Sequence, residues 1–247
     1  MTVTNIQKRN LSGTDFILPL VLVLLGLGFS YFVVEYPQDS IVERYVTYNK
    51  IWDLLVQHIY LVIISGSFAV FTSIPLGILL TRPRFKRYTS LLVNVVNIGQ
   101  TIPSLAILAL FVTILGVGVK TAIFALWLYS LLPILNNTLA GILGVDDSII
   151  EAAKGMGMRP GRILAKIEVP LALPVIMAGI RTSIIINIGT ATLGAFVGAG
   201  GLGELIVAGN NISRWQILVC GALLSALLAI LADHVLGLFE IYLARGR

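Results

Sequence analysis

Residues Ile59–Leu80 read IYLVIISGSFAVFTSIPLGILL and contain no charged side chain. A helix needs about 20 predominantly apolar residues to cross the hydrocarbon core of a bilayer. Within lipid, backbone polar groups find partners only inside a helix or a closed barrel. The stretch is therefore predicted to be a membrane-spanning helix, and other apolar runs of similar length in the chain would be further spans.

Five further runs have the same character. Three are free of charge, and the last two hold Arg181 and then Asp233, His234 and Glu240 as isolated charges. Charged residues make up only 12% of the 247, whereas a soluble domain has roughly 25%. The sequence predicts an all-α polytopic membrane protein with six transmembrane helices, the other five at Phe16–Val34, Leu91–Leu115, Thr121–Leu143, Leu171–Val197 and Ile217–Leu243.

The loops between these runs differ in basic residues, which collect on the cytoplasmic side of membrane proteins. Four of them lie on one side, namely Arg44, Lys50, Lys120 and Arg214. Twelve lie on the other, namely Lys8, Arg9, Arg82, Arg84, Lys86, Arg87, Lys154, Arg159, Arg162, Lys166, Arg245 and Arg247. Both termini are therefore expected in the cytoplasm. The net charge of +5 is explained by these loops, so no nucleic-acid partner is expected.

Two parts are expected along the chain. Residues 1–57 would hold a cytoplasmic tail, the first span and an external loop. Residues 58–247 would form the core, with 144–170 as its largest cytoplasmic loop.

This loop has the signals of two short helices. Ser148 and Glu151 have capping-box spacing, and Gly155 and Gly157 can end the first helix. Pro160 suits the first turn of the second. The residues alone leave two interpretations open: a docking surface for another protein, or an amphipathic connector on the lipid headgroups.

The same loop carries a longer pattern, formed by Glu151, Ala152, Ala153, Gly157, Ile167 and Pro170. In this pattern it resembles the EAA loop of ABC importer permeases, and the one departure is Val169 where leucine is usual. The resemblance implies a coupling helix that docks on separate ATP-binding-cassette ATPase subunits, and a protein of the cytoplasmic (inner) membrane of a bacterium. The chain has no Gly-x-x-x-x-Gly-Lys-Ser/Thr phosphate loop. We therefore expect it to be no enzyme and to bind no cofactor or metal, with ATP and Mg²⁺ held by the partner.

A wider pattern covers three stretches, namely Gly99–Ser104, Gly155–Met158 and Arg181–Gly203. In these stretches the chain resembles the permeases for osmoprotectants such as glycine betaine, choline and carnitine. The resemblance implies the type I importer (MetI-like) permease fold. Methionine and other small-solute permeases share parts of the pattern, so an amino acid is the alternative substrate.

Pro103 lies in the middle of a predicted span and must kink or break it. Gln100, Thr101 and Ser104 can bond the freed backbone groups or face a water path. Broken helices at mid-membrane often mark a solute route, and the alternative is a packing kink. Asn187, Thr190 and Thr192 are polar groups in an apolar run, placed there either as links between helices or as pathway lining.

Gly198, Gly200 and Gly203 match Gly-x-Gly-x-x-Gly, but a dinucleotide site needs a strand before the motif and a helix after it. With Gly201 they are better interpreted as a flexible turn into a short external helix near Leu202–Ala208, part of an outer gate. Gly194 and Gly198 also form a Gly-x-x-x-Gly step suited to close helix contact.

Arg181 and Asp233 are predicted to lie at similar depth, ten residues after Leu171 and nine before Tyr242. Unpaired charges at such a depth are costly, so they are expected to pair. The alternative for Arg181 is that its side chain reaches the lipid headgroups.

The importer interpretation implies three kinds of partner besides lipid: the ATPase subunits, a second permease chain in a homo- or heterodimer, and an extracytoplasmic solute-binding protein. An ATP-independent secondary transporter would need an inverted repeat or a cluster of membrane carboxylates. A membrane enzyme would need a catalytic constellation at one depth. The sequence shows neither.

Overall fold

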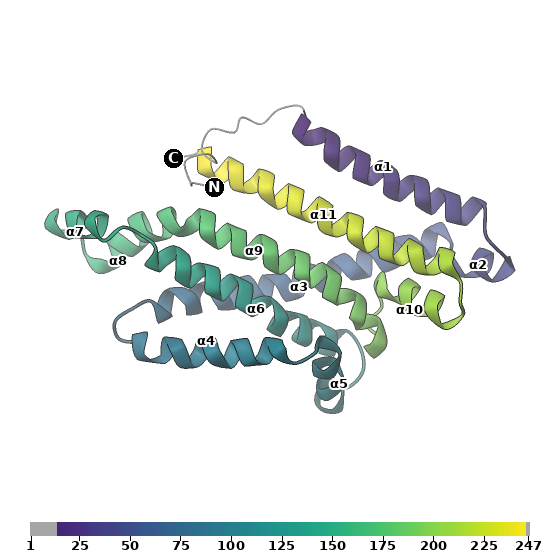
Figure 1. Cartoon of the computed structure of the whole chain (residues 1–247), viewed down its shortest axis with the longest axis horizontal. Coiled ribbons are helices and arrows are strands. Elements are labelled where there is room, and N and C mark those ends of the chain that lie inside the picture. Colours follow the sequence, from purple (N-terminus) through teal and green to yellow (C-terminus); the bar gives the residue numbers. More distant parts are fainter. Residues whose placement is uncertain (1–13, 246–247) are drawn as a thin grey trace.

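The computed structural model describes residues 14–245, without the side chains of residues 14–16, 86, 100 and 243–245. Within that range every element is helical, as Figure 1 shows. The elements are α1 (Thr14–Glu35), α2 (Ser40–Tyr45), α3 (Tyr48–Leu80), α4 (Lys86–Thr101), α5 (Ser104–Leu115), α6 (Val119–Leu143), α7 (Asp147–Gly155), α8 (Pro160–Ile163), the π-helix η2 (Leu164–Glu168), α9 (Val169–Ala191), the 3-10 helix η3 (Thr192–Val197), α10 (Gly203–Asn211) and α11 (Trp215–Arg245).

Five stretches in the described part of the chain are long and apolar enough to cross a membrane: Ile17–Glu35, Tyr48–Leu80, Val119–Leu143, Pro160–Val197 and Trp215–Tyr242. A sixth is a bent pair, α4 followed by α5, whose axes meet at 94°. The six predicted spans are therefore present if the bent pair counts as one.

The bend lies where Pro103 predicts it. Ile102 is extended, with φ −71° and ψ 127°, and α5 starts again at Ser104. A residue before proline is driven out of the helical region, so the predicted break is confirmed. By contrast, Pro75, Pro133 and Pro174 lie inside α3, α6 and α9 without interrupting them.

The centre of the bundle is α6, which makes its most extensive contacts with α9 and α3. Small residues bring these helices together. A Cβ added to Gly179 of α9 would lie 2.5 Å from Asn137 Cβ of α6, and one added to Gly77 of α3 would lie 2.7 Å from Thr138 Cγ2. In lipid such close approach supplies the packing that a hydrophobic driving force supplies in water.

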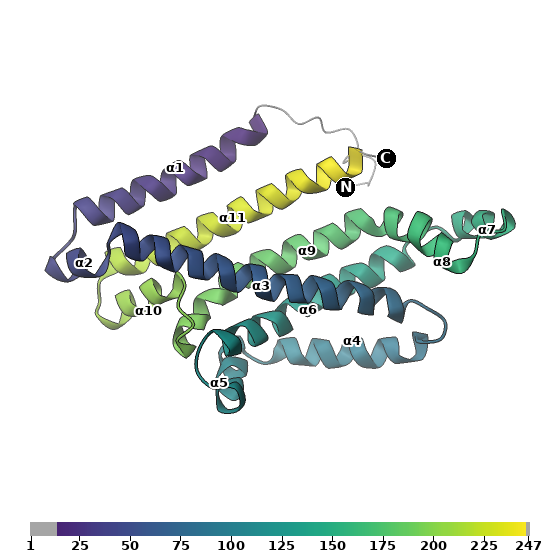
Figure 2. The same cartoon turned by 180° about the vertical axis from the view of Figure 1, so that it is seen from behind.

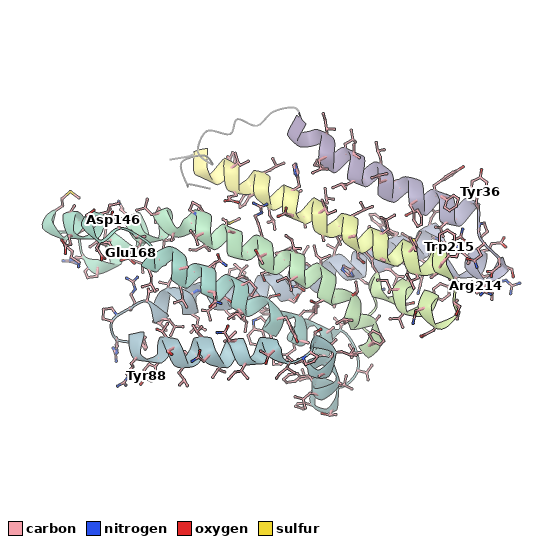
Figure 3. All side chains as sticks on the ribbon, viewed as in Figure 1. Tyr36, Tyr88, Asp146, Glu168, Arg214 and Trp215 are labelled. Carbon is pink, nitrogen blue, oxygen red and sulfur yellow. The ribbon has the colours of Figure 1, made fainter. Side chains whose placement is uncertain are left out.

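The two ends of the bundle carry different elements. Both views place α7 and α8 at one end, hereafter the α7 end, and α2 and α10 at the other, the α10 end (Figures 1 and 2). α1 lies antiparallel beside α11. Figure 3 places Asp146 and Glu168 at the α7 end and Tyr36, Arg214 and Trp215 at the α10 end.

At the α10 end, α1 and α2 are fastened to the start of α11. Gln216 donates to the Tyr36 carbonyl at 3.0 Å and accepts from Gln38 N at 2.6 Å. Arg214 Nε lies 2.5 Å from Asp39 Oδ2. An apolar cluster lies beneath these contacts, formed by Val33, Val42, Val46, Ile51, Leu54, Leu202, Leu205, Ile217 and Cys220.

One boundary differs from the prediction. α3 begins at Tyr48 rather than Ile59, because Thr47 caps it by accepting a hydrogen bond from Lys50 N at 3.2 Å. Polar residues such as Asn49 and Asp53 end an apolar run, but they do not end a helix once it has left the hydrocarbon. The expected division after residue 57 falls inside this unbroken helix.

Candidate functional site

The loop at the α7 end begins with a capped helix. Asp146 is the N-cap residue, and its Oδ1 accepts a hydrogen bond from Ser148 N at 2.8 Å. The predicted capping box of Ser148 and Glu151 is therefore wrong, because Asp146 caps first and places Ser148 already inside the helix. The hydrogen bonds from the Ser148 side chain and backbone hold the pKa of the Asp146 carboxyl below its usual value.

We expect this cap to weaken in acid. Because the folded-state pKa is lowered, the ionised cap stabilises α7 above the unfolded pKa, and that stabilisation is lost as pH falls below about 4. The protection factors of amides 147–155, which correct hydrogen exchange for its slower intrinsic rate in acid, should therefore fall on acidification in the native chain. In Asp146→Asn, which caps without a charge, the cap itself should not respond to pH. An equal fall in protection in both chains would contradict this.

The end of α7 is a left-handed turn at Gly157, whose φ is +75°. Met158 N donates to the Ala153 carbonyl at 3.1 Å, and Gly157 N donates to the Lys154 carbonyl at 2.9 Å. These two bonds form a Schellman motif, which favours glycine at this position. Ala153 is buried, whereas Glu151 and Ala152 are exposed, so α7 presents a free outer face.

The second predicted helix starts at Pro160, as expected. It is not a separate cytosolic helix, however, because α8 continues through η2 into α9. Val169 N donates to the Leu164 carbonyl five residues back, as a π-turn requires. Pro170, the second residue of α9, has no N–H to give the α-helical bond, and the wider turn accommodates it. Ile167, half-buried, lies in this π-segment.

An ion pair that the sequence did not reveal lies beside the loop. Both guanidinium Nη atoms of Arg82, two residues after the end of α3, donate to the carboxylate of Glu168, the last residue of η2. The Glu168 side chain is only 9% exposed. The pair ties α3 to the helix that leads out of the loop. The only sequence signal was a lone acid among basic residues.

At the α10 end, three glycines have positive φ: Gly198 (+68°), Gly200 (+77°) and Gly201 (+80°). They turn the chain from η3 into α10, which confirms the predicted short helix with slightly shifted limits. Gln57 of α3 fixes the turn, because its Oε1 accepts from Gly201 N at 3.2 Å. Gly203 lies against Thr192, where an added Cβ would be 1.8 Å from the Thr192 carbonyl oxygen.

The Gly194 and Gly198 step is not the helix-contact motif that its spacing suggested. Gly194 lies in η3 and Gly198 is the left-handed residue that ends it. The two glycines therefore do not share an α-helical face.

The polar residues Asn187 and Thr190 of α9 and Thr192 of η3 are satisfied within the chain. Asn187 is buried and donates to Ser65 Oγ of α3 at 2.9 Å. Thr190 and Thr192 donate to backbone carbonyls one turn back in α9, at Ile186 and Gly189. Asn187 thus links two helices rather than facing an open cavity in the single chain.

At the α4–α5 break, Thr101 donates to the Ile98 carbonyl at 2.7 Å, and the Tyr129 hydroxyl of α6 donates to the Ile102 carbonyl. Pro103 is exposed and Ser104 half-buried. Gln100 lies in α4, but its side chain is outside the described part of the structure.

Arg181 and Asp233 lie together, and a third charge joins them. Arg181 Nη2 is 2.7 Å from Asp233 Oδ1, and its Nε is 3.0 Å from the same oxygen. Its Nη1 is 3.0 Å from Glu240 Oε2. Glu240 lies two helical turns beyond Asp233 and therefore on the same face of α11. Among the residues described, no group of three or more His, Cys, Asp or Glu side chains could hold a metal ion.

A model of the family described as "Binding-protein-dependent transport system inner membrane component" matches residues 73–241. The chain belongs to this family. The match runs from within α3 almost to the end of α11 and so takes in the α7 loop, the glycine turn and the charge cluster. The long apolar helices fit the family's description as an inner membrane component, and the predicted membrane location is confirmed.

Relatives in this family are close. The choline transport system permease protein OpuBB of Bacillus subtilis (strain 168) is 48% identical over 184 residues, 74% of this chain and 84% of its own. The carnitine transport permease protein OpuCD of Listeria monocytogenes serotype 1/2a (strain 10403S) is 49% identical over 174 residues, 70% and 77% of the two chains. The osmoprotectant import permease protein OsmY of Salmonella typhimurium (strain LT2) is 44% identical over 183 residues, 74% and 78%.

A solved structure shares the fold. The inward-facing MetNI methionine ABC transporter contains a chain that matches with a TM-score of 0.70 at 24% identity, over 78% of this chain and 96% of that one. The expected all-α permease fold is thereby confirmed for this inner membrane component.

Proposed function

We propose that this inner membrane component is the permease subunit of an ATP-driven importer for an osmoprotectant, glycine betaine or a related quaternary ammonium compound. The observation that carries the proposal is the 44–49% identity to permeases named for choline, carnitine and osmoprotectants, over 70–74% of the chain. The methionine transporter is less similar, at 24% identity, which disfavours an amino acid as the substrate.

In this proposal the α7 end faces the cytoplasm, as the excess of Lys and Arg there indicates. The exposed face of α7, with Glu151 and Ala152, docks on the ATPase subunit, which binds ATP and Mg²⁺. The α10 end then faces outward, where a solute-binding protein delivers the substrate. The path would run past the glycine turn and the α4–α5 break.

A second permease chain completes the path. Asn94 and Asn97 on α4, Asn136 on α6 and Thr182 on α9 are exposed in the single chain. Polar side chains inside a membrane usually face protein or a water-filled cavity rather than lipid. A partner permease, either a second copy or a related chain, would cover such surfaces.

Reconstitution tests this function. Liposomes that hold the chain alone should take up no radiolabelled glycine betaine or choline, because the chain has no recognisable ATP-binding motif. Adding the ATPase inside and the binding protein outside should produce uptake that depends on ATP. Uptake by the chain alone, independent of ATP, would favour a secondary transporter instead. ATP-driven uptake of methionine alone would contradict the proposed quaternary ammonium substrate.

A further inference from the structure

A cavity of about 530 Å³ lies at the α10 end, where α3, η3 and the start of α10 meet. Its volume is in the range of small-molecule sites. Leu61, Val119 and Ala195 supply apolar wall, and Gln57, Tyr60 and Glu204 supply the polar and aromatic groups. Apolar walls with a few placed polar groups are typical of a ligand site rather than of a packing defect.

The groups around this cavity are held in place. Gln57 Oε1 accepts from Gly201 N at 3.2 Å, and Glu204 N donates to the Gly201 carbonyl at 2.9 Å. Tyr60 is three residues after Gln57 on α3, hence on the same side of the helix, and its side chain is 52% exposed. Glu204, in the first turn of α10, lines the same cavity as the accessible ring of Tyr60.

A cation already accompanies the carboxylate. Lys50 Nζ lies 2.5 Å from Glu204 Oε1, and both side chains are more than a third exposed. Lys50 precedes Gln57 by two turns of α3, which places it on the same side of that helix. Glu204 lines the cavity, and Lys50 lies beside that lining through its ion pair with Glu204, so a solute can reach both groups.

We propose that this cavity is an entry site for a small zwitterion with a methylated ammonium group, on its way from the binding protein to the path. A quaternary ammonium donates no N–H, so it is held by an aromatic face and a negative charge, here Tyr60 and Glu204. The apolar wall contacts its methyl groups. Lys50 releases Glu204 and binds the carboxylate of the solute. This site rests on the proposed osmoprotectant function.

The charge arrangement gives a test that a purely structural ion pair would fail. Lys50→Met removes the partner of the solute carboxylate. In the reconstituted importer with saturated binding protein, it should lower the uptake rate of glycine betaine roughly tenfold. The rate for choline, which has no carboxylate, should change less than twofold. An equal fall for both solutes would show that the pair only holds α10 on α3, and no fall for either would exclude the site.

The aromatic face is tested with whichever solute the native importer carries. Tyr60→Leu should lower its uptake rate roughly tenfold, whereas Tyr60→Phe, which keeps the ring, should stay within about twofold. Trp52→Leu is the matched control, since Trp52 is an exposed aromatic on α3 that does not line this cavity. Equal rates in the leucine and phenylalanine variants would overturn the proposal. A native importer that carries none of glycine betaine, choline and carnitine would overturn the proposed function itself, and this site with it.

Discussion

Replacing Arg181 with glutamine is expected to lower the melting temperature of the purified chain in lipid nanodiscs by roughly 10 °C. The change leaves Asp233 and Glu240 facing each other with no cation between them. Breaking a buried ion pair from one side costs about 3–5 kcal/mol. The lower end applies here, because Arg181 and Asp233 are 31% and 39% exposed in the single chain. For a domain of this size about 3 kcal/mol corresponds to a shift of that order.

Two further variants give this prediction its control. Arg181→Gln combined with Asp233→Asn should melt higher than Arg181→Gln alone, because only Glu240 then stays unpaired. Arg181→Lys should fall between the native chain and Arg181→Gln, since one ammonium cannot reproduce the contacts that Nε, Nη1 and Nη2 make with two carboxylates. A glutamine variant that melts at the same temperature as the native chain would show that the charge cluster does not stabilise the fold.

Replacing Ala152 with tryptophan is expected to lower ATP-dependent uptake by roughly 10- to 100-fold without unfolding the chain. Ala152 lies on the exposed face of α7, so the new ring meets no side chain of the permease itself. If this face fits a groove on the ATPase, the added bulk costs about 1–3 kcal/mol of docking energy, which corresponds to that loss of affinity.

The measurement is co-purification of the ATPase with the permease, followed by uptake in liposomes. Ala152→Ser is the matched control, because a hydroxyl adds little bulk at the same exposed position. Both variants should melt like the native chain. Full ATPase binding and uptake by the Ala152 variant would remove α7 from the proposed interface.

The spans could be predicted because a segment in lipid must carry apolar side chains and must hydrogen-bond its own backbone, as a helix does. Runs such as Ile59–Leu80 and the break at Pro103 follow from local chemistry alone. Arg181 and Asp233 were found because a charge in lipid has few ways to be satisfied, and depth can be counted from the ends of the spans. Glu240 was missed, although its spacing of seven from Asp233 places it on the same face.

Other features depend on contacts between distant parts of the chain. Lys50 and Glu204 are 154 residues apart in the sequence, and Arg82 and Glu168 are 86 apart, so no local pattern links them. The cap at Asp146 was misassigned because two adjacent acids and Ser148 all qualify, and only the extended backbone at Asp146 decides between them. The π-turn was not foreseen either, because Pro170 could equally have ended the helix.

That π-turn has a mechanical consequence. A helix that closes one turn over five residues instead of four contains one more residue than its length needs. The π-segment Leu164–Glu168 therefore holds one extra residue between the loop and α9. A force on α7 can be absorbed by converting this π-turn into an α-helical turn. That conversion would rotate the loop about the helix axis while α9 stays packed against α6.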